Sequence, residues 1–457
     1  MLDFVVLGSG PAGMAASLRA ARLGQKVCIV EQSRLGGVCL NKGCIPTKVL
    51  LRSAGVFSQI KSARELGIEV EGVNPDFKRI WQRKDRVVRA LGKAMQDQCD
   101  ESGVEIISGR GVLKGPNEVE TVLPDGSARL LKSARVIVAT GSSPIEHPAI
   151  SVDGHRVLNS DHALGLETPP GSIIIIGGGY IGCEFGYLFN EFGAEVTLIE
   201  CLDHLLSDMD PDIGKALAKE FVRSGIKVIT GKAVVNLETT GEGVRAHIQG
   251  EDEALEAEKV LACTGRAPNT GGLGLAETGV RTDGHGYIEV DERCQSNIPN
   301  IYAAGDVTAR GQLANIAHRQ GVVAVESALG LGSVMDYRVI PRCVFTQPEV
   351  AAVGLDEREA GEAGLDVKTE TFEFRRLGKA WVSADTGGFL KLTAEASSGK
   401  VLGVHILGPY ASFLIGEAAL AVKMGMCLED LAADMPVHPT FSEALAEAAR
   451  KLLGKGS

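Results

Sequence analysis

The chain has 457 residues, with 58 acidic against 47 basic side chains and a formal net charge of −11. This length allows about three domains, and the acidic balance argues against nucleic acid or an anionic membrane as the main partner. The ten cysteines are scattered rather than arranged as a secreted disulfide framework, and neither a signal peptide nor a membrane-spanning run is evident, so we expect a soluble cytoplasmic protein.

The first predicted element is a buried strand that ends in a glycine-rich turn and leads into a helix. Residues 4–7 precede Gly8-Ser-Gly10-Pro-Ala-Gly13, and the strand after the helix ends in Glu31. In such a turn the first glycine bends the chain, the second admits a pyrophosphate and the third lets the helix pack closely on the sheet. The helix N-terminus then holds the anion. Glu31 is expected to accept hydrogen bonds from a ribose diol, although a solvated acid at a strand end is the alternative.

A pair of cysteines follows this motif. Cys39 and Cys44 lie five positions apart in Gly-Gly-Val-Cys-Leu-Asn-Lys-Gly-Cys-Ile-Pro-Thr-Lys, which ends at Lys48. On an ideal helix their α-carbons would be roughly 8.6 Å apart, too far for a disulfide, so we expect the backbone to bend, with Gly43 supplying the freedom. Two buried, reduced thiols are the alternative. With the neighbouring glycines, proline, lysine and dinucleotide motif, the pair predicts a dithiol that exchanges electrons with a flavin.

The strand, glycine turn, helix and strand occur a second time. Gly177-Gly-Gly179-Tyr-Ile-Gly182 follows an isoleucine run, and the next strand ends in Glu200, at the same spacing from first glycine to acid as in the first copy. An acidic residue at this position repels a 2′-phosphate, so both sites should prefer unphosphorylated ribose. Two dinucleotide sites in one chain imply an electron relay, with one dinucleotide bound as a prosthetic group and the other exchanging.

Smaller signals lie between and after the two motifs. A predicted strand ends in Ala-Thr140-Gly141 and another ends in Thr-Gly265-Arg, and both turns are read as ends of domain segments. Asp306 comes just past a further strand, where its carboxylate could bond a ribityl hydroxyl. An ordinary turn aspartate at a strand end is the alternative.

Near the C-terminus, His438 is the best acid/base candidate among nine histidines. A thiol reaction needs a group that accepts a proton near neutral pH, and histidine oriented by a carboxylate such as Glu443 has this property. Thr440 and Glu443 also have capping-box spacing, so Glu443 could simply satisfy a helix end.

Together these motifs resemble those of the pyridine nucleotide-disulfide oxidoreductases over essentially the whole chain, and most of all those of members that oxidise dihydrolipoamide. The resemblance implies an α/β fold with two Rossmann-like dinucleotide-binding domains, for FAD and NAD, and a C-terminal α+β dimerisation domain. We expect an FAD-binding domain in two parts, at residues 1–145 and 271–336. We also expect an NAD-binding domain at residues 146–270 and a dimerisation domain at residues 337–457.

The resemblance also implies roles for individual residues. Cys39 exchanges with the substrate disulfide, Cys44 faces the flavin, and Lys48 pairs with Glu184 near the reactive edge of the ring. Lys48 and a nearby helix terminus would lower the cysteine pKa values and favour the thiolate. The residues expected to bind the two cofactors are Gly8, Gly10, Gly13, Glu31, Thr140, Gly141, Gly265 and Asp306 for FAD, and Gly177, Gly179, Gly182 and Glu200 for NAD.

A homodimer is implied as well, in which His438 and Glu443 serve the partner subunit's dithiol. The implied reaction is oxidation of dihydrolipoamide with reduction of NAD⁺. Lipoyl domains or lipoyl carrier proteins of oxo-acid dehydrogenase or glycine-cleavage systems are the expected partners, and no metal is expected. Two alternatives remain: an NADH-dependent reductase of another disulfide or electrophilic substrate, and a flavin-binding subunit without turnover.

Overall fold

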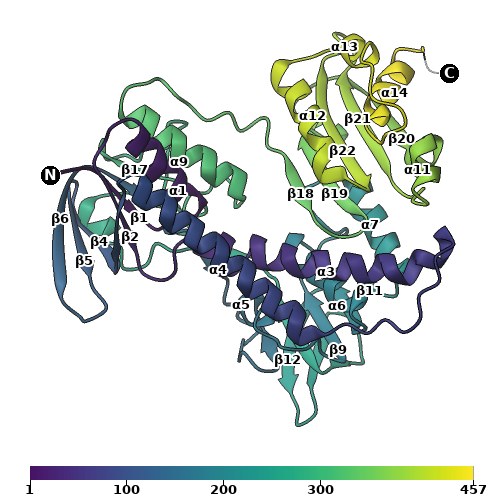
Figure 1. Ribbon diagram of the computed structural model, residues 1–457, viewed down its shortest axis with the longest axis horizontal. Helices are drawn as coiled ribbons and strands as arrows, with labels where there is room; N and C mark the ends of the chain where they lie inside the picture. Colours follow the sequence, from purple (N-terminus) through teal and green to yellow (C-terminus); the bar gives the residue numbers. More distant parts are fainter. Residues whose placement is uncertain (456–457) are drawn as a thin grey trace. The chain divides into compact units, whose positions relative to one another are not determined.

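The computed structural model describes residues 1–455, and these form two compact units (Figure 1). The first unit comprises Met1–Val49, Trp81–Ile145 and Gly265–Asp336, and the second comprises Leu50–Ile80, Glu146–Thr264 and Tyr337–Ser457. Within the described residues, no helix combines the length and the apolar character that crossing a membrane requires. The predicted domain boundaries stay a prediction.

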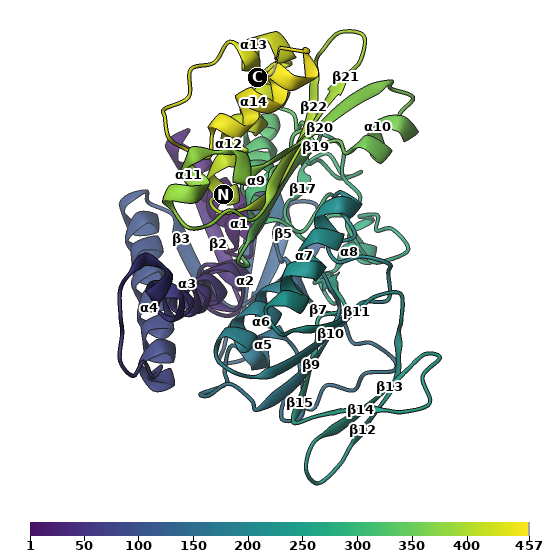
Figure 2. The same ribbon diagram turned by 90° about the vertical axis from the view of Figure 1, so that its right-hand side faces the viewer.

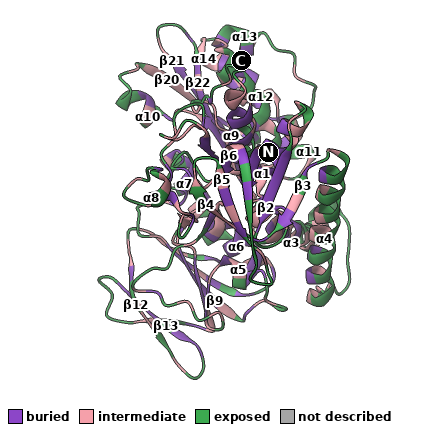
Figure 3. Ribbon diagram, turned by 90° about the vertical axis from the view of Figure 1, so that its left-hand side faces the viewer, coloured by how far each residue is buried: buried purple, intermediate pink, exposed green. Residues whose placement is uncertain are grey.

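The first unit is built on a seven-stranded sheet. Its strands are β1 (Leu2–Leu7), β2 (Val27–Glu31), β3 (Glu105–Ser108), β4 (Arg110–Gly115), β5 (Glu118–Val122), β6 (Ala128–Val138) and β17 (Ile301–Ala303). They follow the order β3-β2-β1-β6-β5-β4, with β17 also beside β6. The pairs among β3, β2, β1, β6 and β17 are parallel, whereas β4 and β5 form an antiparallel extension. Strands β1 and β2 are buried over most of their length because both of their faces are covered (Figure 3).

Helix α1 (Pro11–Arg22) packs on β1 and β2 of this sheet, and α8 (Leu275–Thr278) packs on β4. The other helical segments of this part of the chain are α2 (Gly37–Asn41), α3 (Cys44–Ser62), η1 (Ala63–Leu66), α4 (Phe77–Glu101) and α9 (Ala314–Ala328), of which α3 and α4 are divided between the two units and η1 belongs to the second. Helices α1 and α9 lie side by side (Figure 1), and they pack so closely that a Cβ atom on Gly321 would lie 2.2 Å from the carbonyl oxygen of Ala12. The short strands β7 (Ser142–Pro144) and β16 (Arg266–Pro268) pair as an antiparallel ribbon in the same unit.

The second unit contains a parallel sheet of five strands, in the order β11-β10-β9-β15-β8. These strands are β8 (Val157–Leu158), β9 (Ser172–Ile176), β10 (Glu195–Ile199), β11 (Lys227–Ile229) and β15 (Lys259–Ala262), with helices α5 (Ser160–Ala163), α6 (Tyr180–Glu191) and α7 (Pro211–Arg223). A small antiparallel sheet of β12 (Val234–Thr239), β13 (Val244–Ile248) and β14 (Leu255–Ala257) lies next to it (Figure 2). Val234, Val244 and Ile248 of the small sheet share a core with Ile174 and Ile176 of β9.

The same unit holds an antiparallel sheet in the order β18-β19-β22-β21-β20. Its strands are β18 (Arg342–Val344), β19 (Glu349–Gly354), β20 (Val367–Glu373), β21 (Phe389–Glu395) and β22 (Val401–Gly408). The remaining helical segments are α10 (Glu357–Glu362), η2 (Phe374–Arg376), α11 (Gly378–Val382), α12 (Ala411–Met424), α13 (Leu428–Ala432) and α14 (Glu443–Leu452).

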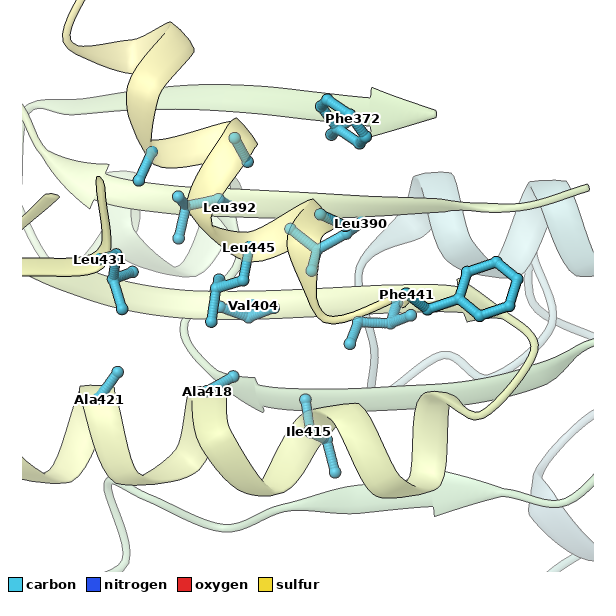
Figure 4. Close-up of a cluster of buried hydrophobic side chains, with 14 of the residues drawn as sticks. Phe372, Leu390, Leu392, Val404, Ile415, Ala418, Ala421, Leu431, Phe441 and Leu445 are labelled. Carbon is cyan, nitrogen blue, oxygen red and sulfur yellow. The ribbon is translucent and has the colours of Figure 1, made fainter. Parts of the chain in front are cut away.

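One face of this antiparallel sheet builds a large apolar core. Leu390, Leu392 and Val404 of the sheet pack with Ile415 of α12 and Leu445 of α14 (Figure 4). Because side chains alternate along a strand, the neighbouring residues point to the opposite face, where α7 packs against β22. The predicted α/β fold class, with two strand–turn–helix–strand repeats and a C-terminal α+β part, is confirmed.

Candidate redox and dinucleotide sites

The first glycine turn has the geometry of a phosphate cradle. Gly8 has φ +99°, and a Cβ atom on it would lie 2.4 Å from the carbonyl oxygen of Ala139. A Cβ on Gly13 would lie 1.9 Å from the carbonyl oxygen of Gly8, whereas nothing lies within 4 Å of the Cβ position of Gly10. Gly10 therefore faces open space at the start of α1, whose first turn contains no acidic residue. The turn fits a pyrophosphate held by a helix N-terminus.

The second turn repeats this geometry. Gly177 has φ +109°, and its Cβ would lie 2.3 Å from the carbonyl oxygen of Cys263. The Cβ of Gly182 would lie 1.9 Å from the carbonyl oxygen of Gly177, and the Cβ position of Gly179 is again open. Helix α6 also lacks an acidic residue in its first turn. The second turn thus fits the same kind of anion as the first.

Each strand-end acid closes its own glycine turn. Glu31 Oε2 accepts the backbone N–H of Ser9 at 2.8 Å, and Glu200 Oε2 accepts that of Gly178 at 2.6 Å. The other oxygen accepts the N–H two residues further on, from Ser33 at 2.8 Å and from Leu202 at 2.8 Å respectively. Both acids are therefore held at the edge of the cradle, as a ribose-binding carboxylate must be.

The two acids differ in how fully they are bonded. The hydroxyls of Ser9 and Ser33 also donate to Glu31, at 2.6 Å and 3.1 Å, so its four lone-pair sites are all used. Glu200 has no such hydroxyls and instead accepts from the thiol of Cys201 at 3.2 Å. A ribose hydroxyl at Glu31 must therefore replace one of the serine contacts. Neither serine was predicted from the sequence, in which the polar residue inside the first turn was the available signal.

The two predicted redox cysteines come together across a helix break. Cys39 lies in α2 and Cys44 begins α3. The chain turns sharply at Gly36 and Gly37, with φ +94° and +58°, and α2 ends at Asn41. Gly43 lies at the bend between α2 and α3, and its φ is not left-handed. A Cβ on it would lie 3.2 Å from the carbonyl oxygen of Val38, so the close packing also favours glycine there. That Gly43 supplies the freedom for this bend stays a prediction.

The electrostatics of the dithiol differ from our expectation for one cysteine. A hydrogen bond with Cys44 raises the pKa of Cys39 well above its ordinary value, and burial and the charge of Asp306 act in the same direction. The ammonium of Lys48 lowers this pKa, but it does not outweigh the other effects. The expected low pKa is therefore wrong for Cys39 in the dithiol state, in which its sulfur is hydrogen-bonded to Cys44. The structure does place Cys39, Cys44, Lys48 and Asp306 close enough to act on one another.

Asp306 is held by a relay from the ribbon of β7 and β16. Its Oδ2 accepts the hydroxyl of Ser142 at 2.7 Å, and Arg266 donates to Ser142 Oγ at 2.8 Å and to the carbonyl oxygen of Ser142 at 2.7 Å. Nearby, Thr140 Oγ1 donates to the carbonyl oxygen of Asn269 at 2.8 Å. Ser142 was not predicted, because its partner Asp306 is 164 positions away. Thr140, Gly141 and Gly265 flank this ribbon, as expected of segment ends.

In the second unit, His438 and Glu443 form the expected pair. The imidazole Nδ1 lies 3.1 Å from Glu443 Oε2, and the other carboxylate oxygen accepts the backbone N–H of Thr440 at 2.6 Å. The hydroxyl of Thr440 donates to Val437 rather than accepting from the N–H of Glu443, so the capping box is only half formed. The His438 side chain is 77% exposed and that of Glu443 is 20% exposed, which leaves the imidazole accessible while its orienting acid is largely covered.

Glu184 lies in α6 and is buried. Its Oε1 accepts the backbone N–H of Phe345 at 3.1 Å. The predicted pairing of Glu184 with Lys48, which belongs to the first unit, stays a prediction.

Two family descriptions match the chain: "pyridine nucleotide-disulphide oxidoreductase" over residues 2–321, and the dimerisation domain of the same family over residues 340–449. The chain belongs to the pyridine nucleotide-disulphide oxidoreductase family, and the resemblance inferred from the sequence is confirmed. The protein is a flavoprotein disulfide oxidoreductase, and its family implies FAD and NAD(H) as cofactors. Both glycine cradles fit these dinucleotides.

Its relatives narrow the class further. The chain is 40% identical over 454 residues to a dihydrolipoyl dehydrogenase of Geobacillus stearothermophilus, covering 99% of this chain and 96% of the relative. It is 39% identical over 467 residues to that of Bacillus subtilis, covering 99% and 98%. Among solved structures, LpdA from Mycobacterium tuberculosis matches with a TM-score of 0.92 and 31% identity, covering 99% of this chain and 100% of that one. The flavoprotein disulfide reductase RclA from Escherichia coli matches with a TM-score of 0.86 and 27% identity, covering 98% and 99%.

Proposed function

We propose that the protein is an NAD-linked dihydrolipoyl dehydrogenase, which oxidises dihydrolipoamide to lipoamide and reduces NAD⁺ to NADH. The observation that carries this proposal is the contact between the dithiol helix and the first cradle. A Cβ atom on Gly37, two residues before Cys39, would lie 2.7 Å from the α-carbon of Gly10. The dithiol is thus built onto the first glycine cradle, and the chain is 40% identical to a dihydrolipoyl dehydrogenase. Together these two observations support dithiol oxidation as the reaction.

The chain's own residues supply the two binding sites. The turn from Gly8 to Gly13, with Glu31 and Asp306, would hold FAD, and the turn from Gly177 to Gly182, with Glu200, would hold NAD. Thr140, Gly141 and Gly265 would border the flavin site, with Lys48 and Glu184 paired near the reactive edge of the ring. When bound, FAD accepts an electron pair from a dithiol and passes it to the nicotinamide of NAD⁺.

The first chemical steps are thiol–disulfide exchange. A substrate thiolate attacks Cys39 Sγ, the Cys39–Cys44 disulfide breaks, and Cys44 leaves as a thiolate. The second substrate sulfur then attacks its partner sulfur in the mixed disulfide, which closes the lipoamide ring and releases Cys39. The substrate thus loses two electrons and two protons: the cysteine pair gains the two electrons, one proton passes to His438, and the other goes to the sulfur of the released Cys39. His438 accepts a thiol proton at its exposed edge, and Glu443 orients the ring and stabilises the imidazolium.

A homodimer would complete this site. The dimerisation-domain match covers His438 and Glu443, and α12 of the same region exposes the large apolar side chains of Phe413, Leu420 and Met424. Covering such side chains with a second copy removes apolar surface from water. We propose that the dimer brings His438 of each subunit to the dithiol of its partner. Lipoyl domains or lipoyl carrier proteins would present the substrate, and a cytoplasmic location stays a prediction.

A reductase of another disulfide is the second candidate. It is favoured by the match to RclA, which is described as an HOCl-induced flavoprotein disulfide reductase. Its identity to this chain, 27%, is well below that of the dihydrolipoyl dehydrogenases. The second candidate would use NADH to reduce the Cys39–Cys44 pair and would run the same exchange steps in reverse.

The proposal is tested by the steady-state oxidation of dihydrolipoamide by the purified FAD-containing protein with NAD⁺ and with NADP⁺. We expect turnover with NAD⁺, and a loss of about 10⁴-fold or more in Cys44→Ser with FAD still bound, because the exchange cannot close without this thiol. Cys427→Ser is the matched control, since Cys427 precedes α13 in the second unit and is not part of the dithiol. Absence of turnover in a flavin-containing wild type that NADH reduces would favour the second candidate.

A further inference from the structure

A row of basic side chains in the second unit faces a short acidic segment. Arg342 of β18, Ala352 of β19, His405 of β22 and Lys391 of β21 are direct cross-strand neighbours, so they share one face of the antiparallel sheet. The segment Asp208-Met-Asp210-Pro-Asp212 lies against this face, between the strand that ends at Glu200 and helix α7. None of these side chains has a role in the reaction described above.

Lys391 makes the strongest of these contacts. Its Nζ lies 3.0 Å from Asp210 Oδ2 and 2.7 Å from Asp212 Oδ2, with Glu357 Oε2 at 3.7 Å. The Lys391 side chain is 8% exposed and that of Asp210 is 2% exposed. Burial alone would lower the pKa of Lys391, but its hydrogen bonds with the two aspartates outweigh this and raise it. Lys391 therefore stays charged, and it is the group that makes a buried carboxylate at Asp210 tolerable.

Asp210 in turn begins α7. Its Oδ1 accepts the backbone N–H of Asp212 at 2.8 Å, as an N-cap residue does. If Lys391 lost its charge, Asp210 would have to turn toward water or take up a proton. Either change would disturb the start of α7 and the loop that precedes it.

That loop packs onto the second dinucleotide cradle. The backbone N–H of Leu206 donates to the carbonyl oxygen of Gly178 at 2.9 Å, and a Cβ on Gly178 would lie 2.6 Å from Leu205 Cδ2. On its other side the loop presses on α7, since a Cβ on Gly214 would lie 2.1 Å from the carbonyl oxygen of Leu205. Gly178 is also the residue whose N–H is bound by Glu200. The loop is therefore wedged between α7 and the cradle.

The segment has a second attachment to the cradle at Asp208. Its Oδ2 accepts the hydroxyl of Tyr180 at 2.8 Å, and Tyr180 is the first residue of α6. Arg342 contacts the same aspartate, through its backbone carbonyl and its carboxylate. Two basic residues of the antiparallel sheet, Arg342 and Lys391, thus contact the acidic segment at its two ends.

We propose that Lys391 is a positioning residue for the nicotinamide dinucleotide site, which it holds in shape by anchoring Asp210 and Asp212 and, through them, the loop on Gly178. The inference rests on the proposed binding of NAD at the second cradle. It predicts that an alteration in the antiparallel sheet, outside the dinucleotide motif, weakens nucleotide binding. Reaction of the flavin with the dithiol should be spared, because the first cradle and Cys39 belong to the other unit.

The experiment compares Lys391→Met, Lys391→Arg and Lys451→Met as FAD-containing proteins. Lys451 is the control because it forms a similar ion pair in the same region, 2.7 Å from Glu370, on elements that do not contact the acidic segment. NADH affinity is measured by fluorescence titration, and reduction of the flavin by dihydrolipoamide by stopped flow. We expect Lys391→Met to raise the NADH dissociation constant by about tenfold, with less than a twofold change in the dithiol reaction. Lys391→Arg and Lys451→Met should stay within about twofold of wild type.

If Lys391→Met does not fold, Asp212→Asn replaces it in the experiment. Asp212 is exposed, so removing its charge leaves no buried charge without a partner. Asp212→Asn should raise the NADH dissociation constant by about threefold. An unchanged NADH affinity in both folded variants would overturn the inference, as would equal losses in NADH binding and dithiol reaction. Wild-type protein that binds NADH but does not oxidise dihydrolipoamide would contradict only the proposed function. Failure of the wild type to bind NADH would overturn the inference itself.

Discussion

Gly37 lies directly against Gly10: a Cβ atom on Gly37 would fall 2.7 Å from the α-carbon of Gly10 and 3.1 Å from its nitrogen. The neighbouring residue Gly36 donates its N–H to Ser9 Oγ at 3.0 Å, and that hydroxyl in turn donates to Glu31. The first cradle, its ribose acid and the helix that carries Cys39 are therefore packed as one piece. A change at Gly37 should affect both cofactor binding and dithiol chemistry.

Gly37→Ala should lower the FAD content of the purified protein to well under half. The substitution places a methyl group inside contact distance of the cradle and also imposes about 1–2 kcal/mol for a left-handed φ. The measurement is the ratio of flavin to protein absorbance after gel filtration. Gly67→Ala is the control, because Gly67 also has a left-handed φ, +78°, but nothing lies within 4 Å of its Cβ position. Equal flavin loss in both variants would mean that backbone strain, and not the contact with Gly10, is responsible.

Glu443→Gln should reduce the turnover of dihydrolipoamide by about tenfold to a hundredfold. The amide keeps the size of the side chain but cannot stabilise a positive charge on His438. The matched control is Glu447→Gln, one turn further along α14, which loses only an ion pair with Arg450. Steady-state kcat with NAD⁺ is the measurement. Wild-type turnover in Glu443→Gln would leave Glu443 with a helix-capping role alone.

Glu200→Arg should raise the KM for NAD⁺ at least about tenfold and improve the use of NADP⁺. The carboxylate that accepts from a ribose diol is lost, and a guanidinium can bind a 2′-phosphate. Kinetics with both nucleotides are compared with those of Glu195→Arg, which makes the same charge change at the other end of β10. An unaltered preference for NAD⁺ in Glu200→Arg would remove this residue from the ribose site.

Leu420→Glu should convert the protein to monomers that keep FAD but lose dihydrolipoamide turnover. A carboxylate placed in an apolar subunit interface costs several kcal/mol, and in the proposed dimer His438 serves the dithiol of the partner subunit. Sedimentation velocity gives the oligomeric state. Val222→Glu on α7 is a close control, since Val222 and Leu420 are both 59% exposed. A dimer that survives Leu420→Glu would exclude this face of α12 as its interface.

Asp385→Asn should stabilise the protein at neutral pH. Burial raises the pKa of Asp385 above 3.8, so the folded protein binds a proton more tightly than the unfolded chain does. The penalty for ionising this buried acid is absent below the unfolded pKa and grows as the pH rises through the folded pKa. Asparagine has no such penalty, and thermal unfolding should show a larger gain at pH 7.5 than at pH 4. The matched control is Asp366→Asn, at an exposed aspartate in the same region, and equal gains in the two variants at pH 7.5 would contradict the prediction.

Local signals explain which parts of the fold were predictable. Glycine turns, β-branched strands and an acid at fixed spacing are set within about thirty residues, so both repeats and the family were found from the sequence. The pairing of His438 with Glu443 is equally local. The spacing of Cys39 and Cys44 likewise shows that the chain must bend between them, although it does not show which residue supplies the bend.

Contacts between distant segments could not be predicted in this way. Ser142 meets Asp306 across 164 positions, and Lys391 meets Asp212 across 179. Nothing in the local pattern of a serine or lysine on a strand indicates such a partner. The raised pKa of Cys39 likewise depends on the hydrogen bond with Cys44 and on burial, both of which require the folded structure, whereas the nearby Lys48, visible in the sequence, indicated the opposite direction.

The two cradles share three glycines and a strand-end acid that binds the turn, but they differ in the hydroxyls of Ser9 and Ser33 and in the segment that is stacked on each turn. On the first cradle, Gly37 and the dithiol helix rest against Gly10. On the second, a loop rests on Gly178 and is anchored through Asp210 to a lysine of the antiparallel sheet. A duplicated nucleotide frame is thus braced at each copy by a segment that lies outside the duplication.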